Sequence, residues 1–514
     1  MTPKHRSPGA LAHSMVAGLS LLLVAAPAGA QNREASSSLE SVVHQLQDQV
    51  RELRQAVAEM RAEAAQYSAE TAELRRELQA TRKQMAASRS GEQAEAAVAS
   101  DKSTSIATRV AALEESSQLQ DRKLDDQYQT KVESASRYRV RLSGMVLLNV
   151  FSNHGAFDNS DFPNYAPEPS PFNSGATLGA SLRQSELGLE VFGPRLAGAR
   201  ASGNLQVDFA GGFPAALNGS SFGVLRLRTA SMRLDWDRTS LLVGQNDVFV
   251  SPQSPTSFAS LAVPAFGYQG NLWGWVPQIR LEHRFALPGG QTLVLQGGLL
   301  DNLSGEPPFV SYDRLQQAGE RSGQPAYGFR AGWSRRLAGQ VMTVGAAGFY
   351  SRQNWGFERH VDGWAGMVDW EVPLARRLSL SGEFYRGRAI GGLGGGIGRS
   401  TLYSGSIYDP ATRIIGLDSV GGWSELKFRA TPKLEFNGAF GLDNPYAEDV
   451  RAFPVTVSYF EPTLTQNRSG FVNFVYRPKS NLLFSTEYRR LRTFAIDRNS
   501  QSAGQMNLIM GVLF

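Results

Sequence analysis

Cysteine is absent from the 514 residues, so no disulfide can stabilise this chain. Histidine is scarce, with 6 residues and no close pair, so the sequence offers no metal-ligand cluster. The net charge of +5 is too small and too evenly spread to indicate a nucleic-acid partner. The glycine run 391–396 lacks the strand-then-helix context of a phosphate cradle and is predicted to be a flexible outer loop. We therefore expect no metal, no cofactor and no nucleic acid.

Long apolar runs are missing as well. The longest candidate, 15–27, is too short for a confident membrane-spanning helix. It follows the basic residues Lys4 and Arg6 and precedes the small residues Ala28-Gly29-Ala30, a pattern typical of a secretory signal. We predict a signal peptide over 1–30 and no transmembrane helix after it. A single N-terminal anchor helix is the alternative.

A seven-residue repeat follows the predicted signal, within residues 36–87. Two apolar series stand four residues apart, as the d and a positions of a coiled coil do. They are Leu39, Leu46, Leu53, Met60, Tyr67 and Leu74, and Val43, Val50, Val57, Ala64, Thr71, Leu78 and Met85. We predict a periplasmic coiled coil over 31–87, with a lone amphipathic helix as the alternative. Residues 88–137 are predicted to be a linker and a weaker coiled segment.

From 138 to 514 the pattern changes to short alternating segments, which is typical of β-strands. Over 433–441, Leu434, Phe436 and Phe440 share one face, while Glu435 and Asn437 share the other. We count about sixteen candidate strands, an even number that suits an outer-membrane barrel. Their expected starts are near 139, 178, 199, 224, 240, 276, 291, 326, 340, 360, 377, 418, 433, 468, 481 and 504.

The connections distinguish a barrel from a soluble sandwich, because long and short gaps alternate, as outer loops and periplasmic turns do. Long gaps are expected near 152–177, 211–223, 246–275, 302–325, 351–359, 389–417, 443–467 and 493–503. Short turns are expected at 193–195, 237–239, 287–290, 431–432 and 478–480. Aromatic residues near strand ends suit interfacial girdles, with ordinary packing as the alternative for each. They are Trp236, Trp275, Trp333, Tyr350, Trp364 and Trp370. The fold class is therefore an all-β transmembrane barrel preceded by an α-helical coiled coil.

With its leader, heptads, sixteen strands and terminal Phe514, the chain resembles the trimeric porins of the phosphate-selective and DcaP-like kind. The segments 182–194, 204–210 and 241–252 are similar to early-strand segments of those families. The resemblance implies a homotrimer in the outer membrane, a water-filled lumen, and a loop at 246–275 folded inward. It also implies that Phe514 addresses the chain to the barrel-assembly machinery.

One departure from the family concerns charge. Phosphate-selective members carry a dense row of arginine and lysine in the lumen, whereas lysine occurs after residue 138 only at Lys427, Lys433 and Lys479. Phosphate selectivity is therefore in doubt. We expect a porin that lets small hydrophilic solutes diffuse passively, with anions as one option, and the sequence leaves the sign of selectivity open.

Strand parity predicts which residues line the pore. Two rows of opposite charge would orient polar solutes across the lumen, while pairing between neighbouring strands is the alternative. The expected pore-lining residues are Arg280, Glu282, Arg284, Arg330, Asp208, Glu435 and Glu487. Arg226 and Arg228 join them with less support, because the apolar pattern shifts parity near Thr229, as at a bulge.

The loop 246–275 is the expected constriction, with Phe258, Phe266, Tyr268 and Trp273 as a stacking surface for a sugar or an aromatic acid. An ordinary loop at the barrel rim or the trimer axis is the alternative.

Two other function classes remain open at this stage. A non-conducting anchor or adhesin would use the coiled coil to grip the cell wall or another periplasmic partner. A lipase or protease would need a catalytic histidine, but His154, His283 and His360 stand at no recognisable spacing from a serine or aspartate. We expect no enzyme, and we expect outer-membrane lipid as the surroundings of the barrel.

Overall fold

The structure is a computed structural model, and it describes residues 139–172, 174–213, 223–305, 314–337, 339–453, 464–497 and 499–514. The predicted signal peptide, coiled coil and linker lie outside the described residues. The strands before the third long loop are β1 (Arg139–His154), β2 (Ala176–Ser181), β3 (Glu186–Leu196), β4 (Ala199–Asp208), β5 (Arg226–Asp235) and β6 (Thr239–Asp247). Then follow β7 (Trp275–Leu287), β8 (Gln291–Leu300), β9 (Ala326–Leu337), β10 (Gln340–Asn354), β11 (His360–Ala375) and β12 (Leu378–Arg388).

The C-terminal part holds β13 (Thr401–Tyr403), β14 (Ile414–Gly416), β15 (Asp418–Thr431), β16 (Leu434–Pro445), β17 (Leu464–Lys479), β18 (Leu482–Ala495) and β19 (Ser500–Leu513). One short helix, α3 (Ala447–Ala452), precedes β17, and 3-10 turns span Glu320–Ser322 and Gly391–Leu393. Strands β13 and β14 form a separate hairpin within the connection from β12 to β15.

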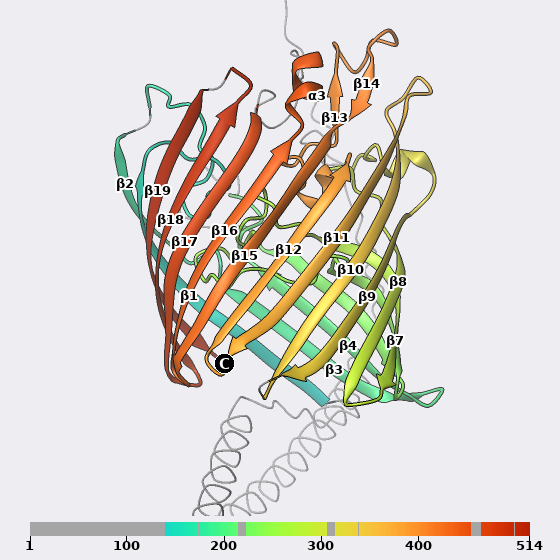
Figure 1. Cartoon of the computed structure of the whole chain (residues 1–514), viewed down its shortest axis with the longest axis vertical. Helices are drawn as coiled ribbons and strands as arrows, with labels where there is room; N and C mark the ends of the chain where they lie inside the picture. Colours follow the sequence, from blue (N-terminus) through green and yellow to red (C-terminus); the bar gives the residue numbers. More distant parts are fainter. Residues whose placement is uncertain are drawn as a thin grey trace, which may run out of the picture. The chain divides into compact units, whose positions relative to one another are not determined.

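The large sheet closes on itself as a barrel (Figure 1). It has 17 strand segments, of which β2 and β3 both pair with β1 and form one interrupted strand, so the wall has sixteen strands. Each strand pairs antiparallel with its neighbour in sequence, and β1 pairs with β19 to complete the ring. A soluble sandwich has free edges, whereas closure leaves none. The predicted sixteen-stranded barrel is confirmed.

Long and short connections alternate around the ring. The loops at one end are 155–175, 209–225, 248–274, 301–325, 355–359, 389–417, 446–463 and 496–499. The turns at the other end are 197–198, 236–238, 288–290, 338–339, 376–377, 432–433 and 480–481. We call these the loop end and the turn end.

One predicted turn is wrong. Residues 193–195 lie inside β3, at a shift of register opposite β4, where Pro194 needs no ladder partner for its missing N–H. The chain turns instead at Ala197 and Gly198, whose φ angles of 48° and 80° give the left-handed pair that a tight hairpin requires.

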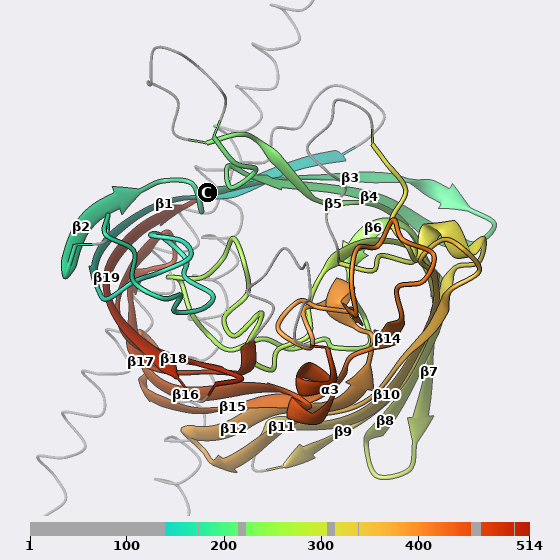
Figure 2. The ribbon, with the colours of Figure 1, turned by 90° about the horizontal axis from the view of Figure 1, so that it is seen from above.

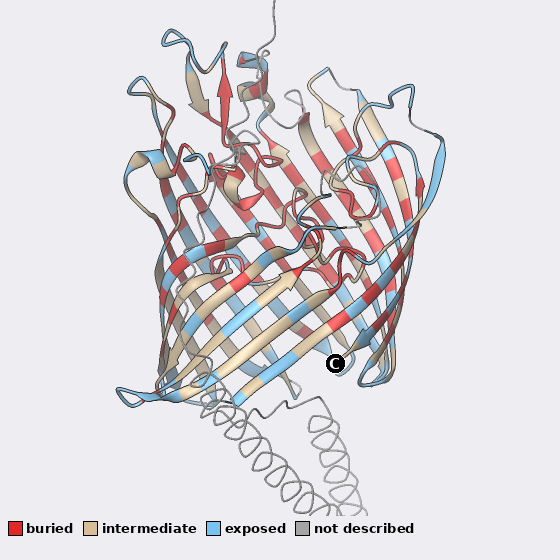
Figure 3. Cartoon of the chain, turned by 180° about the vertical axis from the view of Figure 1, so that it is seen from behind, coloured by how far each residue is buried: buried red, intermediate tan, exposed pale blue. Residues whose placement is uncertain are grey.

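Buried and exposed residues alternate along the strands of the wall (Figure 3). In β17, Val472, Phe474 and Tyr476 are exposed, whereas the residues between them are buried. We call the face with the exposed apolar residues the outer face and the opposite one the inner face. An apolar outer face is what contact with lipid requires of a barrel.

The C-terminus closes the barrel seam. Gly144 in β1 and Phe514 exchange two backbone hydrogen bonds, with N–O distances of 2.9 Å and 3.1 Å. A Cβ atom at Gly144 would lie 2.6 Å from the Phe514 ring and 2.7 Å from the carbonyl oxygen of Glu186. Glycine is therefore the residue that lets the terminal phenylalanine lie on the first strand.

We predict that Gly144→Val destabilises the barrel by about 1–3 kcal/mol, because the added side chain overlaps the Phe514 ring. Urea unfolding of the refolded protein, followed by tryptophan fluorescence, measures the change. Gly348→Val is the matched control, since a Cβ atom at Gly348 meets nothing within 4 Å. Equal unfolding midpoints for both variants would contradict this account of the seam.

Candidate functional site: the barrel interior

The connection 248–274, here called the inner loop, lies inside the barrel (Figure 2). Its backbone and hydroxyl groups bond to side chains from the inner faces of β12, β15, β17 and β18. The inward fold that the family resemblance implied is therefore present. The inner loop lies mainly against β12 and β15–β18, and it also touches the wall from β5 to β9 through Arg226 and through Phe249, which packs beside Gly298 and Gly328.

Three buried glutamates hold the inner loop. Glu383 in β12 accepts hydrogen bonds from the Ser251 hydroxyl and, at 2.8 Å, from the Gln253 amide. Glu425 in β15 accepts from the Thr256 amide at 2.8 Å and from its hydroxyl at 3.2 Å. Buried carboxylates need such donors, because an unpaired one is costly away from water.

The third glutamate, Glu487 in β18, is the centre of a wholly buried network. Its carboxylate accepts from the Ser257 hydroxyl at 2.6 Å and from Asn473 at 3.0 Å, and it pairs with Arg489 at 2.7 Å. Arg489 in turn donates to the Ser260 hydroxyl at 2.9 Å. Glu487 and Arg489 have side-chain exposures of 0% and 2%. Glu487 therefore anchors the inner loop, and the prediction that it borders the pore is wrong, because the loop covers it.

A glutamine and an arginine hold the other side of the inner loop. Gln184, between β2 and β3, donates to the Ala259 carbonyl at 2.9 Å and accepts from the amides of Leu261 and Ala262. Arg226 donates to the Ala262 carbonyl at 2.6 Å. Because Gln184 lies between β2 and β3 and Glu487 lies on β18, the loop is held from more than one part of the wall.

The inner loop makes its closest approach to the wall at Gly270. A Cβ atom there would lie 2.3 Å from the Leu442 carbonyl oxygen and 2.4 Å from that of Gly422. The φ angle of Gly270 is 102°, in the region that favours glycine. No larger residue fits while the loop stays seated on β15 and β16.

The predicted aromatic residues of the inner loop have different roles. Phe266 is 1% exposed and packs on Phe471 with ring centroids 5.2 Å apart, so it cannot offer a stacking surface. Phe258 is half-buried, with the Arg477 guanidinium 5.6 Å from its ring. Tyr268 and Trp273 are also half-buried, 6.1 Å apart, and these two remain candidates for contact with a solute.

A second inward segment packs against the inner loop. The Trp273 amide donates to the Leu393 carbonyl at 3.0 Å, and Gly391, Leu393 and Ile397 are buried. A Cβ atom at Gly392 would lie 2.0 Å from the Leu303 carbonyl oxygen. The glycine run was predicted to be a flexible outer loop, and this is wrong, because its glycines are needed for close backbone contact inside the barrel.

On the wall from β3 to β9, most of the described charged residues of the inner face pair with a neighbour. Two opposed rows of charge, the arrangement that would orient solutes, are therefore absent among the described residues of this wall. The pairs are Arg226 with Asp208 at 2.6 Å, Arg228 with Glu186, Arg284 with Glu282 at 2.7 Å, and Arg330 with Asp369 of β11 at 2.6 Å. Elsewhere on the inner face, Glu435 lies 3.7 Å from Arg477.

Exposure separates the predicted pore-lining residues. Asp208 is 0% exposed, so it supports Arg226 rather than bordering open space, which corrects the prediction. Arg330 is 8% exposed between Asp369 and Gln296. By contrast, the Arg284 side chain is 43% exposed, and the side chains of Arg226, Glu435, Glu282 and Arg228 are 26%, 14%, 12% and 12% exposed.

The parity shift near Thr229 corresponds to a bulge. Gln206 and Val207 of β4 are consecutive, but their partners in β5 are Thr229 and Leu227, which leaves Arg228 without a partner residue in the ladder. An extra residue of this kind changes which face the following side chains occupy. Arg226 and Arg228 therefore both face inward, with their guanidinium carbons 4.9 Å and 4.6 Å from the Trp275 ring. Trp275, predicted for a girdle, packs in this cluster.

Arg280 in β7 differs from the paired arginines named above. It is 9% exposed, and its guanidinium carbon lies 5.5 Å from the Phe249 ring. Among the described residues it has no direct ion pair and no hydrogen bond to its side chain, although the carboxylates of Glu282 and Asp247 act on it electrostatically from a longer distance. A cation without a directly bonded carboxylate is a candidate attraction point for anions.

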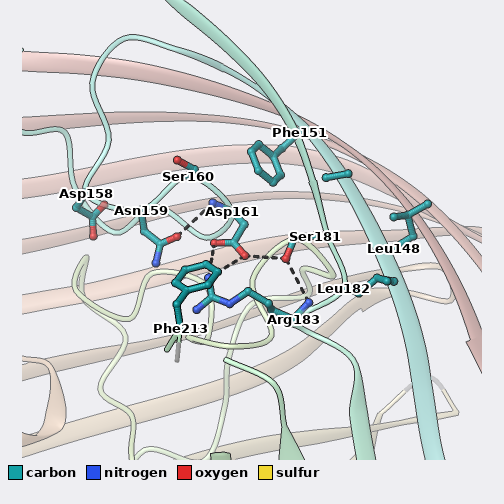
Figure 4. A pocket seen from close by; sticks show the side chains of 11 residues that line it. Leu148, Phe151, Asp158, Asn159, Ser160, Asp161, Ser181, Leu182, Arg183 and Phe213 are labelled. Atoms are coloured by element: carbon teal, nitrogen blue, oxygen red, sulfur yellow. Dashed lines mark hydrogen bonds and ion pairs between the residues drawn. The ribbon is translucent and has the colours of Figure 1, made fainter. Parts of the chain in front are cut away.

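Two cavities adjoin the interior. At the turn end, a cavity of about 530 Å³ is lined by the cations Arg377, Arg429, Lys433 and Arg477 and by one acid, Glu435. Near the loop end, a cavity of about 710 Å³ lies beside the interruption between β2 and β3 (Figure 4). There Asp161 accepts from Ser181 at 2.8 Å and from Arg183 at 3.2 Å. Phe213 lies over the Arg183 guanidinium, 4.4 Å from its carbon.

In the described segments, no three His, Asp or Glu side chains gather closely enough to hold a metal ion. No helix in that part of the chain is long and apolar enough to cross a membrane.

His283 lies on the outer face beside Phe285, with their ring centroids 4.5 Å apart. Its Nδ1 is 2.8 Å from the Thr239 hydroxyl.

We predict that Glu487→Gln lowers the free energy of unfolding by about 3–5 kcal/mol, because Arg489 stays buried without a counter-charge. Glu435→Gln is the matched control, with an expected loss of about 1 kcal/mol or less, because its partner Arg477 is partly exposed. Urea unfolding measures both variants. A cost for Glu487→Gln no larger than that for Glu435→Gln would contradict the anchoring role.

Comparisons with known proteins bear on the fold. No family model and no curated protein matches the sequence. The structure is similar to the outer membrane channel DcaP of Acinetobacter baumannii, with a TM-score of 0.56 and 17% identity, over 75% of this chain and 100% of that chain. The anion-selective porin from Comamonas acidovorans aligns with a TM-score of 0.47 and 10% identity, over 74% and 100% of the two chains. The likeness to DcaP confirms the expected resemblance to sixteen-stranded porins at the level of the barrel fold.

Proposed function

We propose that this chain is an outer-membrane porin through which small hydrophilic solutes diffuse passively. The observation that carries the proposal is solvent exposure of charged side chains within a closed barrel whose outer face is apolar. Arg141 and Glu190 pair across β1 and β3 with exposures of 56% and 39%, and Arg284 on β7 is 43% exposed. A packed interior would cover such charges, whereas sixteen strands leave room for an aqueous channel.

The mechanism of such a pore is geometric. The inner loop narrows the lumen on the side of β12 and β15–β18, and the paired wall from β3 to β9 forms the other side. Because most charges on that wall are paired with a neighbour, the field across the lumen is weak, which suits a general pore rather than a strongly selective one. The likeness to DcaP, itself an outer membrane channel, supports the same function.

We propose a weak preference for anions. Arg280 makes no direct ion pair among the described residues, and Glu282 and Asp247 balance its charge only from a longer distance. The cavity at the turn end adds four cations against one acid. A solute carboxylate or phosphate could exchange between these positions without displacing a buried ion pair. The half-buried Tyr268 and Trp273 would supply an aromatic edge at the narrow part.

The remaining parts of the proposal concern assembly and place. The chain would be exported by a signal peptide over 1–30 and would assemble as a homotrimer in the outer membrane, surrounded by lipid. Phe514 would address it to the barrel-assembly machinery, and a coiled coil over 31–87 would extend into the periplasm, where it could reach the cell wall. These proposals rest on the sequence and on the resemblance to trimeric porins.

We predict stepwise openings in threes when the purified protein is inserted into a planar bilayer. In a KCl gradient, the reversal potential should show a small preference for chloride, and Arg280→Gln should reduce it while leaving the conductance nearly unchanged. Arg386→Gln on the outer face of β12 is the matched control, because it removes the same charge away from the lumen and should leave the reversal potential unchanged. A reversal potential that Arg280→Gln leaves unchanged would contradict the proposed anion preference.

Silence in the bilayer from protein shown to be folded β-sheet would exclude the pore. An anchor or adhesin would then be the better-supported function. Cleavage of lipid or peptide by the same preparation, lost on replacing one histidine, would favour a surface enzyme instead.

A further inference from the structure

Three arginines gather on the outer face at the loop end of β17 and β18. Arg468 lies on the same face of β17 as the exposed Val472, and Arg490 and Arg492 lie on the same face of β18 as the exposed Tyr488. Phe494 lies between two of them, with the guanidinium carbons of Arg468 and Arg492 each 4.8 Å from its ring. We call Arg468, Arg490 and Arg492 the outer arginine cluster.

The register makes this cluster electrostatically unfavourable on its own. Arg468 and Arg492 are direct cross-strand partners, so two like charges stand opposite each other on one face. Like charges in that position destabilise a sheet unless something neutralises them. A stable wall with this pair at its surface therefore implies a source of negative charge nearby.

The chain does not supply that charge within the described residues. None of the three arginines forms an ion pair there, and the polar bond from Arg492 goes to the Ser500 hydroxyl, 3.0 Å away. Their register neighbours on β16 and β19 are Leu442, Gly504 and Ser502, which carry no charge. Most inner-face arginines of the barrel, by contrast, have carboxylate partners.

Another outer-face arginine at the same end shows the contrast. Arg386 of β12 is on the same face as the exposed Phe384, and it donates to the Asp418 carboxylate at 2.9 Å. Tyr446 and Trp364 also flank its guanidinium, at 4.5 Å and 5.5 Å. The chain therefore neutralises one arginine at this level itself and leaves the outer arginine cluster to another molecule.

The position of the cluster selects the occupant. The cluster lies between the apolar outer face, represented by Val472 and Phe474, and the loop-end termini of β17 at Leu464 and of β18 at Ala495. In a barrel that spans a membrane, this is the level of the lipid headgroups on the loop side. Guanidinium groups bind phosphate through two parallel hydrogen bonds, and a headgroup phosphate is the anion held at that depth.

We infer that the outer arginine cluster is a binding site for the phosphate of an anionic lipid in the leaflet on the loop side. One phosphate between Arg468 and Arg492 would neutralise the opposed pair, with Arg490 as a third donor and Phe494 as the apolar floor. This inference rests on the proposed membrane placement but not on conduction. It identifies a lipid as a specific ligand of the wall and not only as its solvent.

The test measures lipid retention by native mass spectrometry. The full-length protein is exchanged into micelles that contain equal amounts of phosphatidic acid and phosphatidylcholine. We expect the wild type to retain phosphatidic acid in preference. Each arginine near an anionic surface contributes about fivefold in affinity, so the triple variant R468Q/R490Q/R492Q should lose about a hundredfold. R386Q is the matched control and should retain the wild-type preference.

Several outcomes would overturn the inference. Equal retention by the triple variant and the wild type would exclude the site, and displacement of the lipid by inorganic phosphate alone would make it a free-anion site. Loss of the trimer without loss of lipid would make the cluster an interface between copies. If the triple variant does not fold, the single variant R490Q should still show the fivefold loss. Bilayer conductance of the wild type separates the two proposals: wild-type protein that retains the lipid in preference but does not conduct would contradict only the proposed pore.

Discussion

The arrangement of the interior depends on the need of buried carboxylates for hydrogen-bond donors. Glu383, Glu425 and Glu487 lie on the inner faces of three strands, where water cannot reach all of their oxygen atoms. The inner loop supplies the donors, from the amides of Gln253 and Thr256 and from hydroxyl groups such as Ser257. Loop and wall therefore complete each other's hydrogen bonding. Without the loop each acid would lose donors, although Glu487 would keep Arg489 and Asn473. Without the acids the amides of Gln253 and Thr256 would lose their acceptors.

This dependence explains where open space remains. The inner loop stays on the wall that carries the three acids, and the wall from β3 to β9 keeps its charges paired among neighbouring strands. Paired charges need no cover from a loop, so they can border water. The inner loop lies mainly on the strands whose buried acids need its hydrogen-bond donors. The outer face differs. There the outer arginine cluster has no carboxylate partner among the described residues, and it lies at the level proposed for the lipid headgroups.

The barrel could be predicted from the sequence because each strand obeys a local rule. Alternation of apolar and polar residues fixed the faces in segments such as 433–441, and the alternating gap lengths fixed the order of loops and turns. The turn near 194 was misplaced because proline favours turns, whereas here it occupies a shift of register. The bulge opposite Val207 left a trace in the sequence, namely the change of parity near Thr229.

The interior was less predictable, because it depends on contacts between residues far apart in the chain. Parity showed that Glu487 faces inward but not that a loop more than two hundred residues earlier covers it. Gln184, Glu383 and Glu425 were missed, although an acid at an inner-face position among apolar neighbours was a usable signal. The glycine run 391–396 suggested freedom of movement, yet its glycines permit close packing. Composition cannot distinguish these two uses of glycine.

The central claim is that the inner loop is seated on the wall, with one side covered and the other bordering the lumen. Because the chain has no cysteine, single cysteines can report on each side. Ser257 is buried against Glu487, whereas Ser254 is exposed. The direct measurement is the rate at which a water-soluble maleimide labels Ser257→Cys and Ser254→Cys in the folded protein, with conductance recorded after labelling. The account predicts fast labelling at position 254 with a fall in conductance, and protection at position 257. Equal labelling at both positions would contradict it.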